Sequence, residues 1–424
     1  MNDYLQHISK IEKKFNLSIN NELKNLVNYK DYKNLTFQNW CNYQEGFSQN
    51  ILDWFLDHNK IKKSSGIFFD PFCGSGSSLI SAKNNGFDVI GMDINPFSTL
   101  LTETKIEKYS KTDIQHIKDF KVPSYREIKK LYDKYEFSMV YKLFSRENFT
   151  KIELLKRSIN KVTNKKAKRF LFTALTCCLE SSSNYRKAGN GLKKRKNIIE
   201  VDFFYEFKQK KEQMLKDIEY IKNHLSHKVI CGNINQVENI LDNNSVDISL
   251  FSPPYPNCFD YFEVYKIELW MGEFVKSYEE LRKLRKTAVT SNLNADLKRD
   301  ISPIDIKNLS DLLFLTMKYL KKEDLWNKNI PKMLILYFYE MNIFIQKLYK
   351  IIKKGGNVGI VIGNSSYGGI PILSDLILAE IANQNKFKVK EVIVARRNET
   401  ASQQYKKISK LIKYIRESII IIEK

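Results

Sequence analysis

Two glycines and one aspartate within residues 66–98 have the spacing of a ligand-binding turn. The apolar residues 67–69 predict a short buried strand, and the Gly74 and Gly76 pair that follows predicts a tight turn. Residues 77–86 predict a helix, and residues 88–94 predict a second strand that carries Asp93 near its end. Units of this kind bind a ligand over the glycine turn, and the acid binds ribose hydroxyls.

Single positions disfavour two common forms of this unit. A dinucleotide site needs a third glycine at position 79, where this chain has Leu79, and the Gly-Lys-Ser/Thr of a P-loop is absent. The segment "DPFCGSG" of residues 70–76 resembles instead the first motif of S-adenosylmethionine-dependent amino-methyltransferases that act on nucleic-acid bases. The resemblance implies S-adenosylmethionine as cofactor, bound by Asp70, Pro71, Phe72, Cys73, Gly74, Gly76, Asp93 and Ile94.

A rigid turn ends a second apolar strand, predicted over residues 246–251. Its residues Ser252, Pro253, Pro254 and Tyr255 resemble the fourth motif of the same family. Methylation of an exocyclic amine needs acceptors for the N–H protons, and prolines hold such acceptors rigidly because φ is fixed. The resemblance implies that Ser252 and the Pro253 carbonyl accept from the amine and that Tyr255 stacks on a flipped base. In this family a serine at the first position accompanies cytosine-N4 targets, and aspartate or asparagine more often accompanies adenine N6.

Other segments follow in the order that the family shows. The aromatic stretch 40–48 resembles the segment beside the cofactor's methionine moiety, where Phe47 is the expected contact. Gly232-Asn233, after a strand predicted from residue 227, stands where the family usually has Gly-Asp, so the Asn233 amide oxygen is expected to accept from the adenine amine. "RES" at residues 416–418 also resembles a family pattern. No Pro-Cys dipeptide occurs, which excludes methylation at C5 of cytosine.

A net charge of +22 favours a polyanionic partner. The helical periodicity of residues 105–226 predicts an insertion, which is a candidate DNA and target recognition segment. Within it, residues 183–197 predict a basic loop in contact with DNA phosphates, with an aromatic side chain for stacking. The expected DNA-binding residues of this loop are Tyr185, Arg186, Lys187, Lys193, Lys194, Arg195 and Lys196.

Cysteine usage and hydropathy bear on the compartment. The six cysteines contain no Cys-x-x-Cys pair and histidines number five, so no metal site is expected and the cysteines are predicted to be free thiols. The first residues do not resemble a signal peptide, and no apolar run is long enough for a membrane span. We therefore expect a cytoplasmic protein that has no membrane partner.

These observations predict an α/β fold, a Rossmann-like seven-stranded methyltransferase sheet with large helical insertions. Residues 1–104 are expected to hold N-terminal helices and the cofactor site, residues 105–226 the insertion, and residues 227–424 the second catalytic part with another helical insertion at about 273–335. The predicted enzyme is a DNA cytosine-N4 methyltransferase of a restriction-modification or defence system. It acts on double-stranded DNA, with a cognate restriction endonuclease as a candidate partner. The alternatives are an adenine-N6 DNA methyltransferase, an RNA base methyltransferase, and a non-catalytic nucleic-acid-binding protein; oligomeric state is left open.

Overall fold

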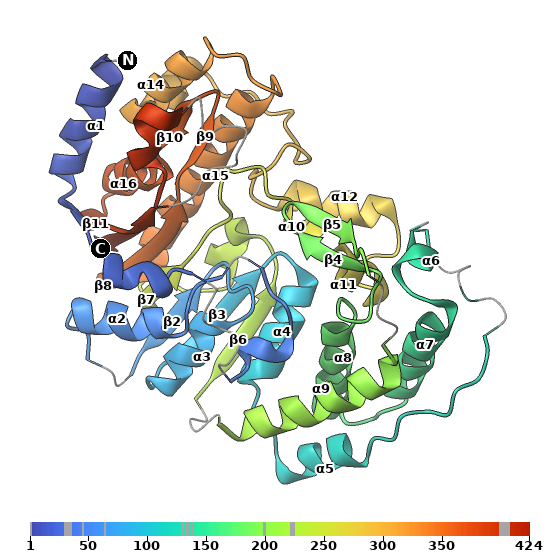
Figure 1. Cartoon of the computed structure of the whole chain (residues 1–424). Coiled ribbons are helices and arrows are strands. Elements are labelled where there is room, and N and C mark those ends of the chain that lie inside the picture. Colours follow the sequence, from blue (N-terminus) through green and yellow to red (C-terminus); the bar gives the residue numbers. More distant parts are fainter. Residues whose placement is uncertain are drawn as a thin grey trace.

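An eight-stranded, mostly parallel sheet forms the centre of the molecule (Figure 1). The computed structural model describes residues 2–28, 36–44, 46–62, 65–128, 131, 135–136, 139–197, 201–220, 225–397 and 408–424. The strands lie in the order β1 (Leu17–Ile19), β11 (Lys388–Arg397), β12 (Arg416–Glu423), β8 (Ile352–Gly363), β7 (Val246–Phe251), β2 (Ile67–Asp70), β3 (Asp88–Asp93) and β6 (His227–Cys231). Only β12 runs antiparallel to its neighbours, β8 and β11. The predicted α/β class is confirmed, and β1 is an eighth strand that the sequence did not indicate.

Both faces of the sheet are covered, because successive side chains of a strand point to opposite faces. Phe68 packs into one hydrophobic core and the adjacent Phe69 into the other. The first face carries α2 (Asn50–His58), α3 (Ser77–Asn84) and α4 (Pro96–Ile106). The opposite face carries α15 (Ile330–Ile351) and α16 (Ser374–Gln384), with α14 (Asp311–Leu320), α13 (Pro303–Leu309) and α1 (Asn2–Lys14) outside them.

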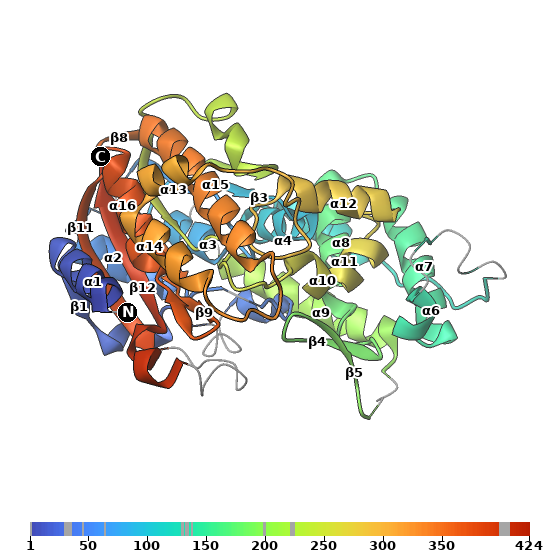
Figure 2. The same cartoon turned by 90° about the horizontal axis from the view of Figure 1, so that it is seen from above.

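The first insertion is helical and extends away from the sheet (Figure 2). Its elements are α5 (Lys111–Asp119), α6 (Val140–Leu143), α7 (Arg146–Asn160), α8 (Lys165–Cys178), the hairpin β4 (Tyr185–Ala188) and β5 (Gly191–Lys194), α9 (Phe203–Asp217) and η4 (Ile218–Tyr220). Polar residues begin its helices: Ser110 forms a capping box with Asp113, and Asn164 accepts from a backbone N–H of α8. The insertion shares its hydrophobic core with the α4 face of the sheet, which ties it firmly to the catalytic part.

A second insertion lies between β7 and α15. It contains α10 (Tyr261–Val264), α11 (Lys266–Met271) and α12 (Tyr278–Thr287), followed by α13 and α14. The remaining short elements are η1 (Asn21–Asn25), η3 (Gln38–Trp40), η5 (Ile234–Asn239), β9 (Ser365–Tyr367), β10 (Ile370–Ile372) and η6 (Ser409–Tyr414). Among the described residues, no helix combines the length and the apolar character needed to cross a membrane.

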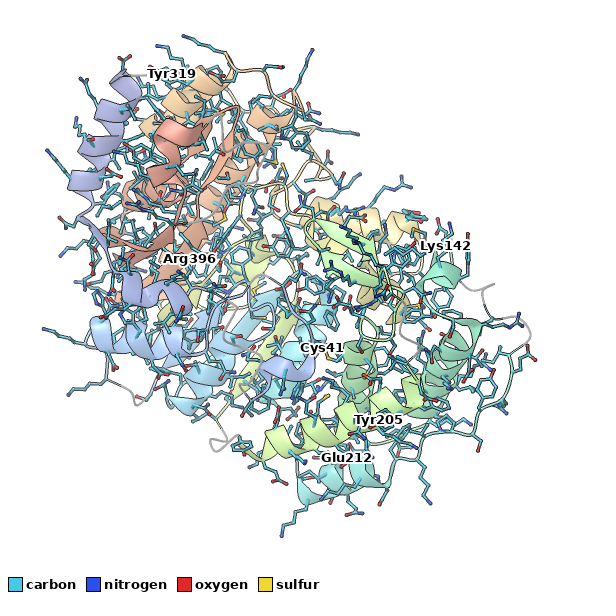
Figure 3. The ribbon with its side chains drawn as sticks, viewed as in Figure 1. Cys41, Lys142, Tyr205, Glu212, Tyr319 and Arg396 are labelled. Atoms are coloured by element: carbon cyan, nitrogen blue, oxygen red, sulfur yellow. A yellow bond between two sulfur atoms is a disulfide. The ribbon has the colours of Figure 1, made fainter. Side chains whose placement is uncertain are left out.

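The segment 36–44 joins the first insertion to the catalytic part (Figure 3). Cys41 and Cys177 of α8 form a disulfide, so the prediction that all cysteines are free thiols is wrong for these two. The error has a simple cause, since 136 residues separate the pair and no spacing pattern joins them. The indole N–H of Trp40 also donates to Asp217 of α9 at 2.8 Å.

Candidate active site

The glycine turn follows β2 and is held by the side chain that ends this strand. The Asp70 carboxylate accepts from the backbone N–H of Phe72 at 2.9 Å and from the Ser78 hydroxyl. Gly74 has φ 49° and Gly76 has φ 83°, a left-handed region that favours glycine. A side chain at Gly76 would also meet the Thr102 hydroxyl at 2.9 Å. Asp70 is buried and both of its carboxylate oxygens bond to residues of the turn and the following helix. It therefore stabilises the turn and does not line the cavity. Burial raises the pKa of Asp70 to about 7.

Asp93 at the end of β3 faces the space over this turn. One of its oxygens accepts from the backbone N–H of Gly74 at 2.9 Å, and the other accepts from that of Asn95 at 2.8 Å. Each carboxylate oxygen has a second lone pair, so both can still accept from hydroxyls of a ligand. Burial raises the pKa of Asp93 to about 6, although the two backbone bonds favour the ionised form.

Some of the predicted cofactor residues line a cavity, and the others lie behind its wall. Phe47, Pro71, Phe72, Gly74, Asp93, Ile94 and Asn233 line one cavity, whereas Asp70, Cys73 and Gly76 do not line it. The Asn233 amide oxygen accepts from the backbone N–H of Asn235 at 2.8 Å, and its amide nitrogen donates to the Thr287 carbonyl. Asn233 therefore fixes the end of α12 beside the cavity, and its oxygen keeps one lone pair for a ligand amine.

The Ser-Pro-Pro-Tyr turn opens into the same cavity from the end of β7. Ser252, Pro254 and Tyr255 line it, and Pro253 is buried beneath them. The ring of Phe72 packs against Phe251 with centroids 5.7 Å apart, which joins this turn to the glycine turn. The order of β7, β2 and β3 places the cavity where strand order reverses, the usual ligand position in an open α/β sheet.

Several cavity residues were not predicted from the sequence. Tyr43 belongs to the aromatic segment from which only Phe47 was chosen; its hydroxyl bonds to Ser98 at 2.9 Å and its ring stacks on Tyr265. The second insertion and the β11–β12 pair supply many of the others. These further lining residues include Tyr261, Phe262, Thr287, Ala288, Val289, Ser291, Asn292, Arg396 and Glu417. In the sequence, Glu417 stands out only as part of the family pattern at residues 416–418, and that pattern predicted no role for it.

The predicted basic loop is the β4–β5 hairpin, which projects from one edge of the molecule (Figure 2). Arg186 pairs with Lys193 across the hairpin, so two like charges lie side by side on its exposed face. Lys194 and Lys196 are also exposed, and Tyr185 is half-buried. We call Arg186, Lys193, Lys194 and Lys196 the hairpin cations.

Two of the predicted DNA-binding residues face the protein. Lys187 is buried, and its ammonium group lies 2.5 Å from the Glu268 carboxylate and 4.4 Å from the centre of the Tyr265 ring. Arg195 donates to the carbonyls of Ser183 and Glu180 at 3.0 and 3.1 Å. Lys187 is therefore not placed to contact a phosphate, and Arg195 holds the hairpin to the end of α8. Lys187 is buried because successive side chains of a strand point to opposite faces, so that Lys187 points toward the core when Arg186 points to solvent.

The sheet order and the two motif turns that share one cavity define a Rossmann-like methyltransferase. Residues 46–302 match the family model described as D12 class N6 adenine-specific DNA methyltransferase. This match spans more than half of the chain and includes both motif turns. The chain belongs to the D12 class N6 adenine-specific DNA methyltransferase family.

Relatives of known type match almost the whole chain. Type II methyltransferase M.BsoBI of Geobacillus stearothermophilus is 26% identical over 98% of this chain and 91% of its own. Type II methyltransferase M.AvaI of Nostoc sp. is 25% identical over 92% of this chain and 89% of its own. Among solved structures, the rRNA methyltransferase aviRa from Streptomyces viridochromogenes aligns over 90% of this chain and 87% of its own, with 8% identity and a TM-score of 0.31.

The family match corrects the target base. The sequence predicted a cytosine-N4 enzyme from Ser252, and this prediction is wrong because the family is specific for adenine N6. The physical reason lies in the reacting group: N4 of cytosine and N6 of adenine are both exocyclic amines that donate N–H bonds and delocalise a lone pair into a ring. A serine hydroxyl can accept from either amine, so the residue type alone does not select the base.

Proposed function

We propose that the protein transfers a methyl group from S-adenosylmethionine to the exocyclic N6 amine of adenine in double-stranded DNA. The observation that carries this proposal is the single cavity of about 230 Å³ that both motif turns line. Family membership supplies the target base. S-adenosylmethionine would supply an electrophilic methyl group.

The residues of the glycine turn side fit such a cofactor. The Asp93 carboxylate offers acceptors for ribose hydroxyls, and the backbone of Gly74 allows close approach because no side chain stands there. Ile94 offers apolar contact for an adenine ring, and Asn233 offers an acceptor for the adenine amine. Phe47 offers apolar contact for the methionine moiety. This donor and acceptor set suits a nucleoside better than a phosphate, since the wall of the cavity carries a carboxylate.

The residues of the Ser-Pro-Pro-Tyr side fit a flipped adenine. Ser252 and the Pro253 carbonyl would accept from the N6 protons and draw the nitrogen lone pair out of conjugation. The Tyr255 ring offers a stacking face for a base that must leave the duplex. Held by two prolines, these groups lose little conformational entropy when the base arrives.

The hairpin cations would position the duplex. Arg186 and Lys193 repel each other in the isolated protein, and a phosphate between them would remove that repulsion. The first insertion therefore remains the candidate target recognition segment. Since M.BsoBI and M.AvaI bear the name type II methyltransferase, we also propose a restriction-modification role with a cognate endonuclease as partner.

The test is identification of the methylated nucleoside. Purified protein is incubated with unmethylated duplex DNA and S-adenosylmethionine, and the digested product is analysed by mass spectrometry. N6-methyladenine is the expected product, and it should be absent when Ser252 and Tyr255 are both replaced by alanine. RNA as the preferred acceptor, or no methylated nucleoside from any substrate, would contradict the proposal.

A further inference from the structure

A chain of hydrogen bonds connects Ser252 to an ion pair on the last two strands. The Ser252 hydroxyl lies 3.4 Å from the Tyr255 hydroxyl, at the long end of the hydrogen-bonding range. Tyr255 bonds to one oxygen of Glu417 on β12, and Arg396 on β11 bonds to the other oxygen. Glu417 is buried at the cavity wall, and Arg396, labelled in Figure 3, is partly exposed.

The chemistry of the four groups fixes the direction of every bond in this chain. A guanidinium group only donates, and an ionised carboxylate only accepts. Arg396 therefore keeps Glu417 as an acceptor, and the Tyr255 proton must point at Glu417. Once that proton is committed, the Tyr255 oxygen faces Ser252 as an acceptor, so the Ser252 proton points at Tyr255.

This direction matters because a serine hydroxyl can either donate or accept. The target amine brings N–H donors, so a Ser252 proton directed at the amine would repel it. We propose that Glu417, held by Arg396, is a positioning residue that turns the Ser252 proton toward Tyr255, so that the Ser252 lone pairs face the target amine. This inference rests on the proposed function, and it requires only that the substrate present an exocyclic amine.

Glu417→Gln is the most selective perturbation, because it keeps the shape and changes the bond directions. Arg396 still needs an acceptor, so the amide oxygen turns toward it and the amide NH₂ faces Tyr255. The Tyr255 proton is then driven toward Ser252, and the Ser252 proton toward the base. We expect kcat to fall about tenfold, the equivalent of one hydrogen bond, while KM for DNA changes less than about twofold.

A second substitution separates this explanation from simple damage to the site. Tyr255→Phe keeps the stacking ring and removes the hydroxyl, so no proton is driven toward Ser252. On its own it should lower kcat less than Glu417→Gln does. The double variant Glu417→Gln/Tyr255→Phe should match Tyr255→Phe within about twofold and turn over faster than Glu417→Gln alone. A role limited to packing predicts instead that the double variant is the slowest.

The control is Glu423→Gln at the other end of β12. Glu423 also forms an ion pair, with Lys390 at 3.2 Å, but it does not line the cavity, so kcat should not change. Single-turnover methylation of duplex DNA is measured for all variants, with the product nucleoside identified. If the wild type forms N6-methyladenine and the double variant is no faster than Glu417→Gln, the inference fails and the proposed function stands. If the wild type methylates a different exocyclic amine, the base assignment fails and the same rate comparison still decides the role of Glu417. A wild type that methylates no amine would overturn both.

Discussion

Replacement of Asp93 by alanine tests the cofactor side of the cavity. Asp93 lines the cavity, and its carboxylate accepts from the backbone N–H of Gly74 at 2.9 Å. Among the described cavity residues, no other charged side chain bonds to the glycine turn. The variant removes the proposed acceptor of the ribose hydroxyls and releases the bond that holds Gly74. Both effects should weaken S-adenosylmethionine binding while the fold remains, since Asp93 lies at the end of its strand rather than in the core.

The expected loss follows from the type of bond. A hydrogen bond to a charged group contributes about 1.5–3 kcal/mol, and every 1.4 kcal/mol is about tenfold in Kd. We therefore expect Kd for S-adenosylmethionine to rise about 10- to 150-fold. The effect should depend on pH, because the pKa of Asp93 is raised to about 6 by burial. Its carboxylate is ionised above pH 6 and protonated below, so wild-type affinity should be full above about pH 7 and fall as the pH drops through about 6.

Isothermal titration calorimetry between pH 5 and 8 measures both effects. Asp70, with a pKa of about 7, titrates in the same range, and the Asp93 charge contributes to raising that pKa. The two proteins are therefore compared first at pH 8, where both carboxylates of the wild type are largely ionised. The matched control is Asp88→Ala at the amino end of the same strand, where the carboxylate accepts from the backbone N–H of Ser226 and does not line the cavity. A folded Asp93→Ala protein with wild-type affinity at pH 8 would refute the assignment.

Four further outcomes are expected. Ser252→Ala should lower kcat on the order of 100-fold, as loss of one preorganised polar group does in other active sites. Tyr255→Ala should weaken capture of the extruded base by about 1–3 kcal/mol. Single-turnover rates measured together with equilibrium DNA binding distinguish the two effects. Replacement of the hairpin cations by glutamine should weaken DNA binding for all sequences. It should also reduce the slope of log affinity against log salt by about 0.9 for each phosphate that the variant no longer neutralises. An unchanged slope would exclude the hairpin from the interface. Lys187→Met should instead lower the free energy of unfolding by about 3–5 kcal/mol, measured by chemical denaturation, because it leaves Glu268 buried without its cation.

The two motif turns could be predicted because each is encoded by adjacent residues. The glycines that reach positive φ, the aspartate that ends a strand and the double proline all act within a few positions of one another. Because β2 and β7 run parallel, the turns that follow them lie at the same edge of the sheet. The α/β class follows from the same local signals, whereas the order of the strands in the sheet was not predicted.

What the sequence did not reveal depends on contacts between distant segments. Strand β1 has three residues, too few for a periodic signal of its own, and it pairs with β11 375 positions away. Lys187 was counted with the basic loop because charge is visible in the sequence and burial is not. Its partner Glu268 comes from another insertion. The disulfide of Cys41 with Cys177 is hidden in the same way.

The wrong target base shows where specificity resides in this site. In the proposed mode of binding, Ser252, Pro253 and Tyr255 would meet features that adenine and cytosine share, an exocyclic amine and a flat ring, so their types carry little information about which base enters. The two bases differ in ring size and in the positions of their ring nitrogens. The edges of the base that carry these differences must contact other residues of the cavity wall. In this chain that wall comes from the second insertion, through Tyr261 and Asn292. Asn292 accepts a backbone bond through its amide oxygen, from Asn294 at 2.9 Å, which leaves its NH₂ as a donor for a ring nitrogen. We therefore expect the choice of base to depend on lining residues such as Tyr261 and Asn292, which stand outside both motifs and which only the folded chain brings to them.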